Sequence, residues 1–254
     1  MGIFDAIILG IVEGLSEFLP ISSTGHLILA SALLKLPQTD AHKVFEVVIQ
    51  LGAMLAVVEV YRKQLFARPE LLKKLCWAFL PTGTIGFLLY KLVKSFFQPS
   101  LVSYMLIAGG IAFIVIELWM KDRPATTHTL DEVSYRQAFI IGLVQCISMV
   151  PGVSRSGATI IGGLVCGLDR KDAAEFSFLL ALPTMLAATC YDIYKNHSVF
   201  HMGDWQNIAV GFVVSFIFGV IGIKALLKFV TSHTFIPFGI YRIAAGIIFL
   251  VFMF

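Results

Sequence analysis

Two glutamates lie one helical turn apart near the start of the chain, within a stretch that is otherwise apolar. Glu13 and Glu17 are four residues apart, so they share one face of a helix. Two carboxylates this close in apolar surroundings repel each other, and one keeps a proton unless a cation lies between them. Mg²⁺ or Ca²⁺ would satisfy both, because hard cations bind carboxylate oxygens and also phosphate oxygens. The pair therefore predicts a divalent-cation site, with an internal ion pair to an arginine as the alternative.

A run of hydroxyl side chains and a histidine follows Pro20. The run consists of Ser22, Ser23, Thr24 and His26. Serine and threonine cap helix N-termini, whose free N–H groups bind anions, so capping alone would explain the hydroxyls. Capping does not account for His26, which falls one turn after Ser22. Beside two carboxylates it is a candidate catalytic residue, whereas an isolated histidine in a membrane helix is usually a packing residue.

A second hydroxyl-rich segment follows Pro151 and carries an arginine. It contains Ser154, Arg155, Ser156 and Thr159. The guanidinium of Arg155 is a planar fork that matches phosphate oxygens, and the three hydroxyls supply further donors. A structural ion pair is the alternative. Together the two segments offer carboxylates for a metal, a histidine and an arginine cradle, which predicts a phosphorylated or pyrophosphorylated ligand.

The composition is typical of a helical membrane protein. The 254 residues are 58% hydrophobic and 14% charged, with a mean hydropathy of +0.87. A soluble domain normally carries about 25% charged residues. We expect an all-α polytopic membrane protein, because helices satisfy their own backbone hydrogen bonds in lipid. The net charge of +3 is too small to indicate a nucleic-acid partner.

Two of the apolar segments are long and polar in the middle. Pro20 interrupts the first, and Pro151 with Gly152 interrupts the fifth. A proline removes a helix hydrogen bond, so each break leaves a helix C-terminus facing a new N-terminus. We expect each of these two segments to be a pair of half-helices that folds back within the membrane. The apolar segments lie at about 3–33, 45–61, 75–93, 101–120, 137–168, 175–193, 206–229 and 237–254.

The chain also repeats itself. One ungapped slide places Gly10 on Gly142 and Ser22 on Ser154, and further matches at nearly the same offset continue into the following segment. Chance similarity between glycine-rich apolar stretches is the alternative to duplication. We expect one membrane domain, 1–254, made of two repeats at about 1–120 and about 137–254.

Lysine and arginine predict the orientation. They concentrate in the loop after the second segment and at the ends of later segments on the same side of the membrane. The positive-inside rule assigns this side to the cytoplasm. Three crossings per repeat give the repeats opposite orientations, with about six transmembrane helices plus two re-entrant helical hairpins. Transporters build substrate sites in this way. The basic residues are Arg62, Lys63, Arg68, Lys73, Lys74, Lys121, Arg123, Arg136, Arg170 and Lys171.

Other polar residues in or near the apolar segments have simpler explanations. His197 and His201 are expected in a solvated loop. Four charged residues near segment ends are expected to reach the membrane surface along their own side chains. These four are Glu117, Glu175, Lys224 and Arg242.

The two polar motifs resemble those of the undecaprenyl-pyrophosphate phosphatase family, also called the bacitracin-resistance proteins. The matching stretches are Glu13-Gly-Leu-Ser-Glu17 followed by Phe-Leu-Pro-Ile-Ser-Ser-Thr-Gly-His26, and Pro151-Gly-Val-Ser-Arg-Ser-Gly-Ala-Thr159. The resemblance covers nearly the whole chain. It implies hydrolysis of the terminal phosphate of a C55 polyprenyl pyrophosphate, which regenerates the carrier lipid for peptidoglycan synthesis, and a divalent-metal requirement. It also implies a bacterial inner membrane and an active site open to the periplasm, in agreement with the orientation predicted from charge.

The resulting hypothesis is a metal-dependent phosphatase of a membrane-embedded prenyl pyrophosphate. Glu13 and Glu17 would hold the cation. Ser23 is the candidate nucleophile, with His26 as base or phosphate ligand, although a histidine nucleophile or a metal-activated water would use the same residues. The remaining phosphate-binding candidates are Ser22, Thr24, Ser154, Arg155, Ser156 and Thr159.

A polyprenyl-phosphate transporter or flippase is the alternative from a different class, alone or as a second activity. The repeat favours it, because hydrolysis at one membrane face does not require pseudo-symmetry. The clustered serine and histidine favour the enzyme. The oligomeric state is left open, a homodimer included.

Overall fold

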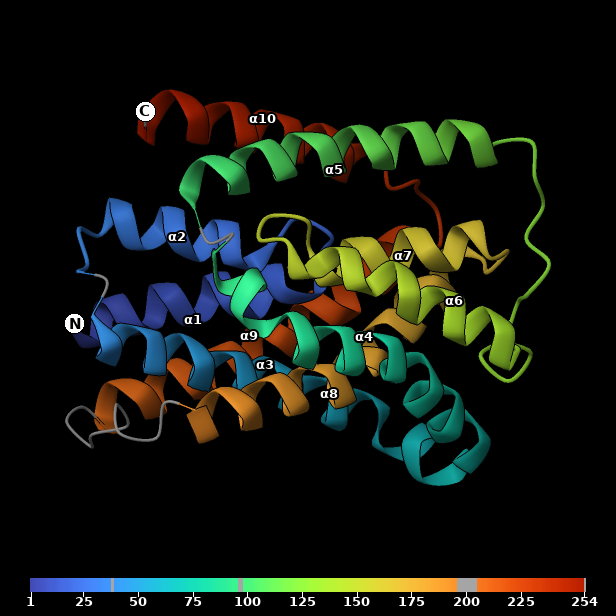
Figure 1. Ribbon diagram of the computed structural model, residues 1–254, viewed down its shortest axis with the longest axis horizontal. Coiled ribbons are helices and arrows are strands. Elements are labelled where there is room, and N and C mark those ends of the chain that lie inside the picture. Colours follow the sequence, from blue (N-terminus) through green and yellow to red (C-terminus); the bar gives the residue numbers. More distant parts are fainter. Residues whose placement is uncertain (38, 96–97, 196–204, 254) are drawn as a thin grey trace.

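The computed structural model describes residues 1–254 apart from 38, 96–97, 196–204 and 254, so His197 and His201 lie outside the described residues. The described chain is helical nearly throughout and has one isolated β-bridge, between Thr127 and Leu168. Figure 1 shows the elements in space. In chain order they are α1 (Ile3–Phe18), α2 (Ser23–Leu33), α3 (Asp40–Ala67), α4 (Pro69–Ser95), α5 (Pro99–Met120), α6 (Tyr135–Gln145), the 3₁₀ turn η1 (Cys146–Met149), α7 (Arg155–Val165), α8 (Arg170–Lys195), α9 (Trp205–Val230) and α10 (Ile236–Met253).

Breaks at the expected positions divide the first and fifth apolar segments into helical hairpins. The first break follows Leu19, which ends α1 in an extended conformation. The second contains Gly152 at φ +93°. In both hairpins the returning helix is preceded by a serine with positive φ, 72° at Ser22 and 75° at Ser154. This conformation costs a non-glycine residue on the order of 1 kcal/mol, so contacts around the two turns must hold it.

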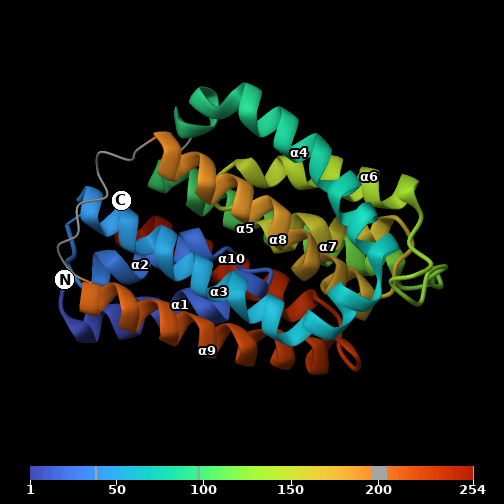
Figure 2. The ribbon, with the colours of Figure 1, turned by 90° about the horizontal axis from the view of Figure 1, so that it is seen from below.

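The two hairpins enter from opposite ends of the molecule. In Figures 1 and 2, α1 and α2 extend from the end that carries the N-terminus, and α6 and α7 extend from the other end. Their tips meet inside the molecule, where Ser156 Oγ donates a hydrogen bond to Leu19 O at 3.0 Å. The two polar motifs are therefore brought together by the fold.

Glycine allows one helix of each hairpin to approach a long helix closely. Helix α1 packs on α9, where a Cβ at Gly14 would lie 2.5 Å from Ser215 O. Helix α6 packs on α4, where a Cβ at Gly142 would overlap Ala78 O. Small residues permit such backbone contacts between membrane helices. Each hairpin is thus packed against a helix from the other half of the chain.

Within the described part of the chain, four helical stretches are long and apolar enough to cross a membrane. They are Asp40–Ala67, Ser100–Met120, Arg170–Tyr191 and Trp205–Val230. Helix α10 is apolar but falls in the shorter class. These four stretches support a multi-pass, all-α membrane protein, and the expected count of six spans goes beyond them.

The basic segment after α3 is helical, whereas a loop was expected. Only Arg68 separates the end of α3 from the start of α4. Lysine, arginine and glutamate are good helix formers, and pairs three residues apart lie along both helix ends. These pairs are Arg62 with Glu59 and Lys73 with Glu70.

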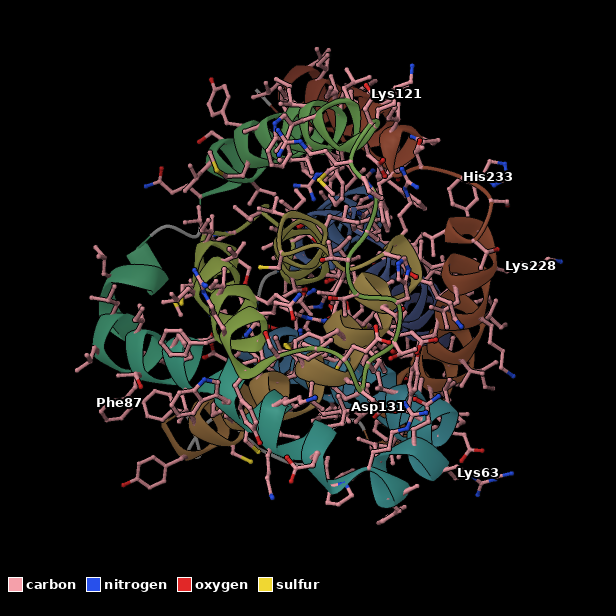
Figure 3. All side chains as sticks on the ribbon, turned by 90° about the vertical axis from the view of Figure 1, so that its right-hand side faces the viewer. Lys63, Phe87, Lys121, Asp131, Lys228 and His233 are labelled. Carbon is pink, nitrogen blue, oxygen red and sulfur yellow. The ribbon has the colours of Figure 1, made fainter. Side chains whose placement is uncertain are left out.

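Basic side chains gather at one end of the molecule. Figure 3 is viewed from the right-hand side of Figure 1 and shows Lys63, Lys121 and Lys228 directed outward around that end. Helix α6 begins at the same end, opposite the N-terminus (Figure 1). Lys63 and Lys121, which the sequence assigns to the cytoplasm, thus lie at the same end of the molecule.

Three of the four charged residues that were expected to reach the membrane surface are instead buried. Glu117 accepts hydrogen bonds from Arg170 and from a backbone N–H, and its residue is 3% exposed. Arg242 is fully buried and donates to backbone carbonyls of other helices. The expectation was wrong because these partners are distant in sequence. Glu175 is also buried, so the expectation was wrong for it too, whereas Lys224 is exposed.

Candidate active site

An ion pair joins the two hairpins. Glu17 lies in the last turn of α1, and Arg155 is the first residue of α7. Arg155 Nη2 donates to Glu17 Oε1 at 2.9 Å, and the two side chains are only 10% and 5% exposed. Charges this deeply buried are costly unless they are paired. The expected alternative of an internal ion pair is therefore present, between one acidic and one basic residue of the two polar motifs.

The second oxygen of Glu17 accepts a hydrogen bond from a serine. Ser23 Oγ donates to Glu17 Oε2 at 2.6 Å, and Ser23 is the first residue of α2. A carboxylate that accepts a hydrogen bond from a hydroxyl is positioned to act as the general base for that hydroxyl. Glu17 thus connects a candidate nucleophile with a fixed positive charge.

The guanidinium of Arg155 is only partly used by the protein. Its Nη1 donates to Ser177 O at 3.0 Å, and Ser177 lies on α8. Among the described residues its Nε has no hydrogen-bond partner, although the atom is buried. Sequence reasoning did not identify Ser177 as part of the site. Its place in the Phe-Ser-Phe stretch that follows Glu175 was the available signal.

The hydroxyls of the second motif are engaged within the protein. Ser154 Oγ accepts a hydrogen bond from a backbone N–H in the first turn of α7 at 3.1 Å. Ser156 Oγ binds Leu19 O. Thr159 Oγ1 is 2.6 Å from Ser177 Oγ. All three hydroxyls are thus hydrogen-bonded within the protein, and a bound phosphate would have to share them.

His26 lies against α10. Its Nδ1 is 2.8 Å from Ser22 O, and its Nε2 is 2.7 Å from the hydroxyl of Tyr241, whose ring stacks on the imidazole. A carbonyl can only accept, so Nδ1 carries the proton and a neutral His26 accepts from Tyr241 through Nε2. No described contact joins His26 to Glu17 or Ser23. Tyr241 carried no signal in the sequence, because its partner belongs to the other half of the chain.

The other two hydroxyls of the first motif have less defined roles. Ser22 is buried in the turn before α2, and within the described chain its hydroxyl makes no capping bond to that helix. Thr24 is half-buried in the first turn of α2. Their position at a helix N-terminus, where backbone N–H groups are free, leaves both available to an anion.

Glu13 is the least satisfied group of the site. It has no exposed surface, and neither carboxylate oxygen has a hydrogen-bond partner among the described residues. Glu17, Glu46 and Arg155 are close enough to act on it electrostatically. A buried carboxylate without partners requires either a proton or a cation.

The donor set of Glu13 fits a divalent cation better than that of Glu17 does. Both oxygens of Glu17 already bind protein groups, and the described chain contains no cluster of three or more histidine, cysteine, aspartate or glutamate side chains that could enclose a metal. Mg²⁺ is commonly held by one or two carboxylates together with water and substrate phosphates. Glu13 can supply one such ligand without displacing Arg155 or Ser23.

Comparison with known proteins identifies the family. The model of the family described as "Bacitracin resistance protein BacA" matches residues 6–248. A protein of Sulfurihydrogenibium sp. named undecaprenyl-diphosphatase is 58% identical over 249 residues, 98% of this chain and 98% of that protein. A protein with the same name from Persephonella marina is 58% identical over 253 residues, which cover all of both chains. Another, from Methanococcus aeolicus, is 47% identical over 252 residues, which cover 99% of each chain. The chain belongs to the bacitracin resistance protein BacA family.

Proposed function

We propose that this protein hydrolyses undecaprenyl pyrophosphate to undecaprenyl phosphate and inorganic phosphate, and so returns carrier lipid to peptidoglycan synthesis. Relatives named undecaprenyl-diphosphatase match it over nearly their whole length. The observation that carries the proposal is the position of Glu17, which holds the Ser23 hydroxyl on one oxygen and the Arg155 guanidinium on the other. A nucleophile, a base and a phosphate-binding cation are thereby joined in one buried site.

Ser23 is the proposed nucleophile. Its Oγ bonds to the terminal phosphorus while its proton passes to Glu17 and on to the leaving group. The bridging P–O bond breaks, and its electron pair leaves with undecaprenyl phosphate. Water then attacks the phosphoserine, and Glu17 takes a proton from the water and returns it to Ser23 Oγ as inorganic phosphate departs.

Arg155 is proposed to neutralise the terminal phosphate during both steps. Its Nε, which has no partner among the described residues, and the N–H groups in the first turns of α2 and α7 support this role. Ser154, Ser156 and Thr159 are proposed to fix the first turn of α7, where Arg155 lies, and to share their hydroxyls with the phosphates. Ser22 and Thr24 are assigned to the opposite side of the same phosphates.

His26 is assigned to the substrate and not to nucleophilic attack. Both of its ring nitrogens are already hydrogen-bonded. Nδ1 binds the Ser22 carbonyl, and this bond breaks only if the imidazole ring turns. Its Nε2 becomes available when Tyr241 moves aside. We propose that this nitrogen then contacts the pyrophosphate.

A divalent cation, Mg²⁺ or Ca²⁺, is proposed to bind beside Glu13. When bound, it supplies charge neutralisation for the pyrophosphate. Glu13 would hold it, with Glu17 as a second ligand only if one of its present partners is exchanged. The orphaned oxygens of Glu13 support this assignment.

We further propose an inverted repeat with about six transmembrane helices and two re-entrant hairpins, placed in the bacterial inner membrane. The opposed hairpins support the repeat (Figures 1 and 2). The basic end in Figure 3 supports a cytoplasmic position for the α3–α4 turn. The first hairpin then opens toward the periplasm, which is the proposed side of substrate entry.

A polyprenyl-phosphate transporter is the second candidate, and the opposed hairpins are the observation that favours it. The two functions separate in detergent, where no second compartment exists. We expect the purified protein to release phosphate from C55 and short-chain prenyl pyrophosphates, and to lose this activity with a chelator. Full binding of the lipid without phosphate release would favour transport.

A further inference from the structure

Arg242 is a buried arginine that contacts both hairpin tips. It lies in α10, has no exposed surface, and pairs with no carboxylate among the described residues. Its Nη1 donates to Pro20 O in the first turn at 3.0 Å. Its Nη2 donates to Gly152 O and Val153 O in the second turn at 3.0 and 2.9 Å.

The same side chain is also bound to α5. Arg242 Nε donates to Leu106 O at 3.3 Å, and Nη2 lies 3.2 Å from Met105 O. A Cβ at Gly109 of α5 would overlap Nη2, so the absence of a side chain there creates the space that the guanidinium occupies. The planar fork is therefore fixed in a slot between α5 and the two turns.

The acceptors explain why an arginine is placed there. Carbonyls at the ends of broken helices have no partner of their own, and each unsatisfied group in the membrane interior costs several kcal/mol. One guanidinium satisfies three such carbonyls from two separate hairpins. A lysine ammonium has three donors on a single nitrogen and cannot span acceptors arranged around a planar fork.

The contacts lie immediately before the proposed catalytic residues. Pro20 precedes Ser23 by three residues, and Val153 precedes Arg155 by two. A shift of either turn would therefore move the Ser23 and Arg155 side chains relative to each other. We propose that Arg242 is a positioning residue for phosphoryl transfer, which locks the two hairpin tips together so that Ser23 and Arg155 act on one phosphate. The inference rests on the proposed roles of these two residues.

The test compares Arg242→Gln, Arg242→Lys and Gly109→Ala with the wild-type chain in detergent. The control is Glu117→Gln, which weakens a buried polar contact that α5 makes with Arg170 of α8 and with the backbone of Phe235, just before α10. The measurements are kcat and KM for a short-chain prenyl pyrophosphate, and the thermal midpoint.

We expect Arg242→Gln to lower kcat about 100-fold, the loss that a displacement of about 1 Å can cause, with KM within about threefold of wild type. Gly109→Ala should show the same pattern, because it displaces the guanidinium and keeps its charge. Arg242→Lys should recover only part of kcat. Glu117→Gln should lower the thermal midpoint about as much as Arg242→Gln does, and should keep kcat within about threefold of wild type.

Two results would overturn the inference. Equal losses of kcat in Arg242→Gln and Glu117→Gln at equal thermal midpoints would mean that Arg242 only contributes to stability. Full recovery of kcat by Arg242→Lys would mean that charge without fork geometry is sufficient. If Arg242→Gln does not fold, Arg242→Lys and Gly109→Ala are judged by the same criteria. An active Ser23→Ala variant in the same assay would instead refute the assignment of the nucleophile.

Discussion

Two buried carboxylates bind arginine in this protein, and their surroundings differ. Glu117 receives three contacts of 2.6 to 3.3 Å from Arg170 and a backbone N–H from Phe235 at 2.7 Å. Glu17 receives one contact from Arg155 and one from a serine hydroxyl. Both oxygens of Glu117 are fully occupied by these donors, and we call the Glu117–Arg170 pair the closed pair.

We call the Glu17–Arg155 pair the open pair, because polar atoms at and beside it lack hydrogen-bond partners among the described residues. Beside it, both oxygens of Glu13 and the Nε of Arg155 are buried without partners in the described chain. Unsatisfied buried groups are costly, and they are retained where a ligand completes them. The comparison supports the proposal that the Glu17–Arg155 pair takes part in the chemistry, whereas the Glu117–Arg170 pair is structural.

The largest effect is expected from breaking the open pair. Glu17→Ala or Arg155→Ala should lower phosphate release about 1000-fold or more, because the first removes the base and the second the charge that stabilises the transferring phosphoryl group. The matched change at the closed pair, Glu117→Gln, should reduce the thermal midpoint and leave turnover nearly unchanged. Near-normal turnover in either alanine variant would contradict the distinction between the two pairs.

The next effect concerns the hydroxyl that Glu17 holds. Ser23→Ala should lower kcat about 100-fold or more and abolish any phosphate retained on acid-quenched protein. Ser22→Ala, one residue away in the same turn, is the control and should affect KM more than kcat. Retained phosphate in Ser23→Ala would transfer the role of nucleophile to another group.

A smaller effect is expected at the orphaned carboxylate. Glu13→Gln keeps the shape of the side chain and weakens cation binding, so the Mg²⁺ concentration for half-maximal activity should rise about tenfold. Glu59→Gln, at an exposed position of α3, should leave it unchanged. An unaltered cation dependence in Glu13→Gln would show that Glu13 is satisfied by a proton instead.

The smallest effect is expected at the His26 contact. Tyr241→Phe removes one hydrogen bond to Nε2 and keeps the stacked ring. A single hydrogen bond contributes about 1 kcal/mol, so kcat/KM should change by less than about tenfold. A loss as large as that of Ser23→Ala would give Tyr241 a direct part in the reaction.

The sequence predicts those parts of the site that depend on local chemistry. Pro20 and Pro151 with Gly152 break their helices because proline cannot continue them, and the hydroxyl runs beside the breaks were visible as motifs. The resemblance of both motifs to one family identified the family correctly. The roles assigned to the individual site residues stay proposals.

The sequence does not predict contacts whose partners are backbone atoms or distant helices. Arg242 was expected at the membrane surface, yet it binds carbonyls of three separate segments, and carbonyls leave no pattern in a sequence. Tyr241 carries no signal because its partner, His26, lies in the other half of the chain, whereas Ser177 lies in a Phe-Ser-Phe stretch that could have indicated it. The charged residues at the end of α3 and the start of α4 predict a loop, but lysine and glutamate are also good helix formers, and the segment is helical.

Glu17 and Arg155 are proposed to act as one unit, with each residue supplied by a different hairpin. A double-mutant cycle of Glu17→Gln and Arg155→Lys, measured as kcat/KM for phosphate release, tests this most directly. We expect the double variant to be no more than about threefold slower than the slower single variant. Losses that multiply in the double variant would show that the two residues act independently, and would contradict the shared site.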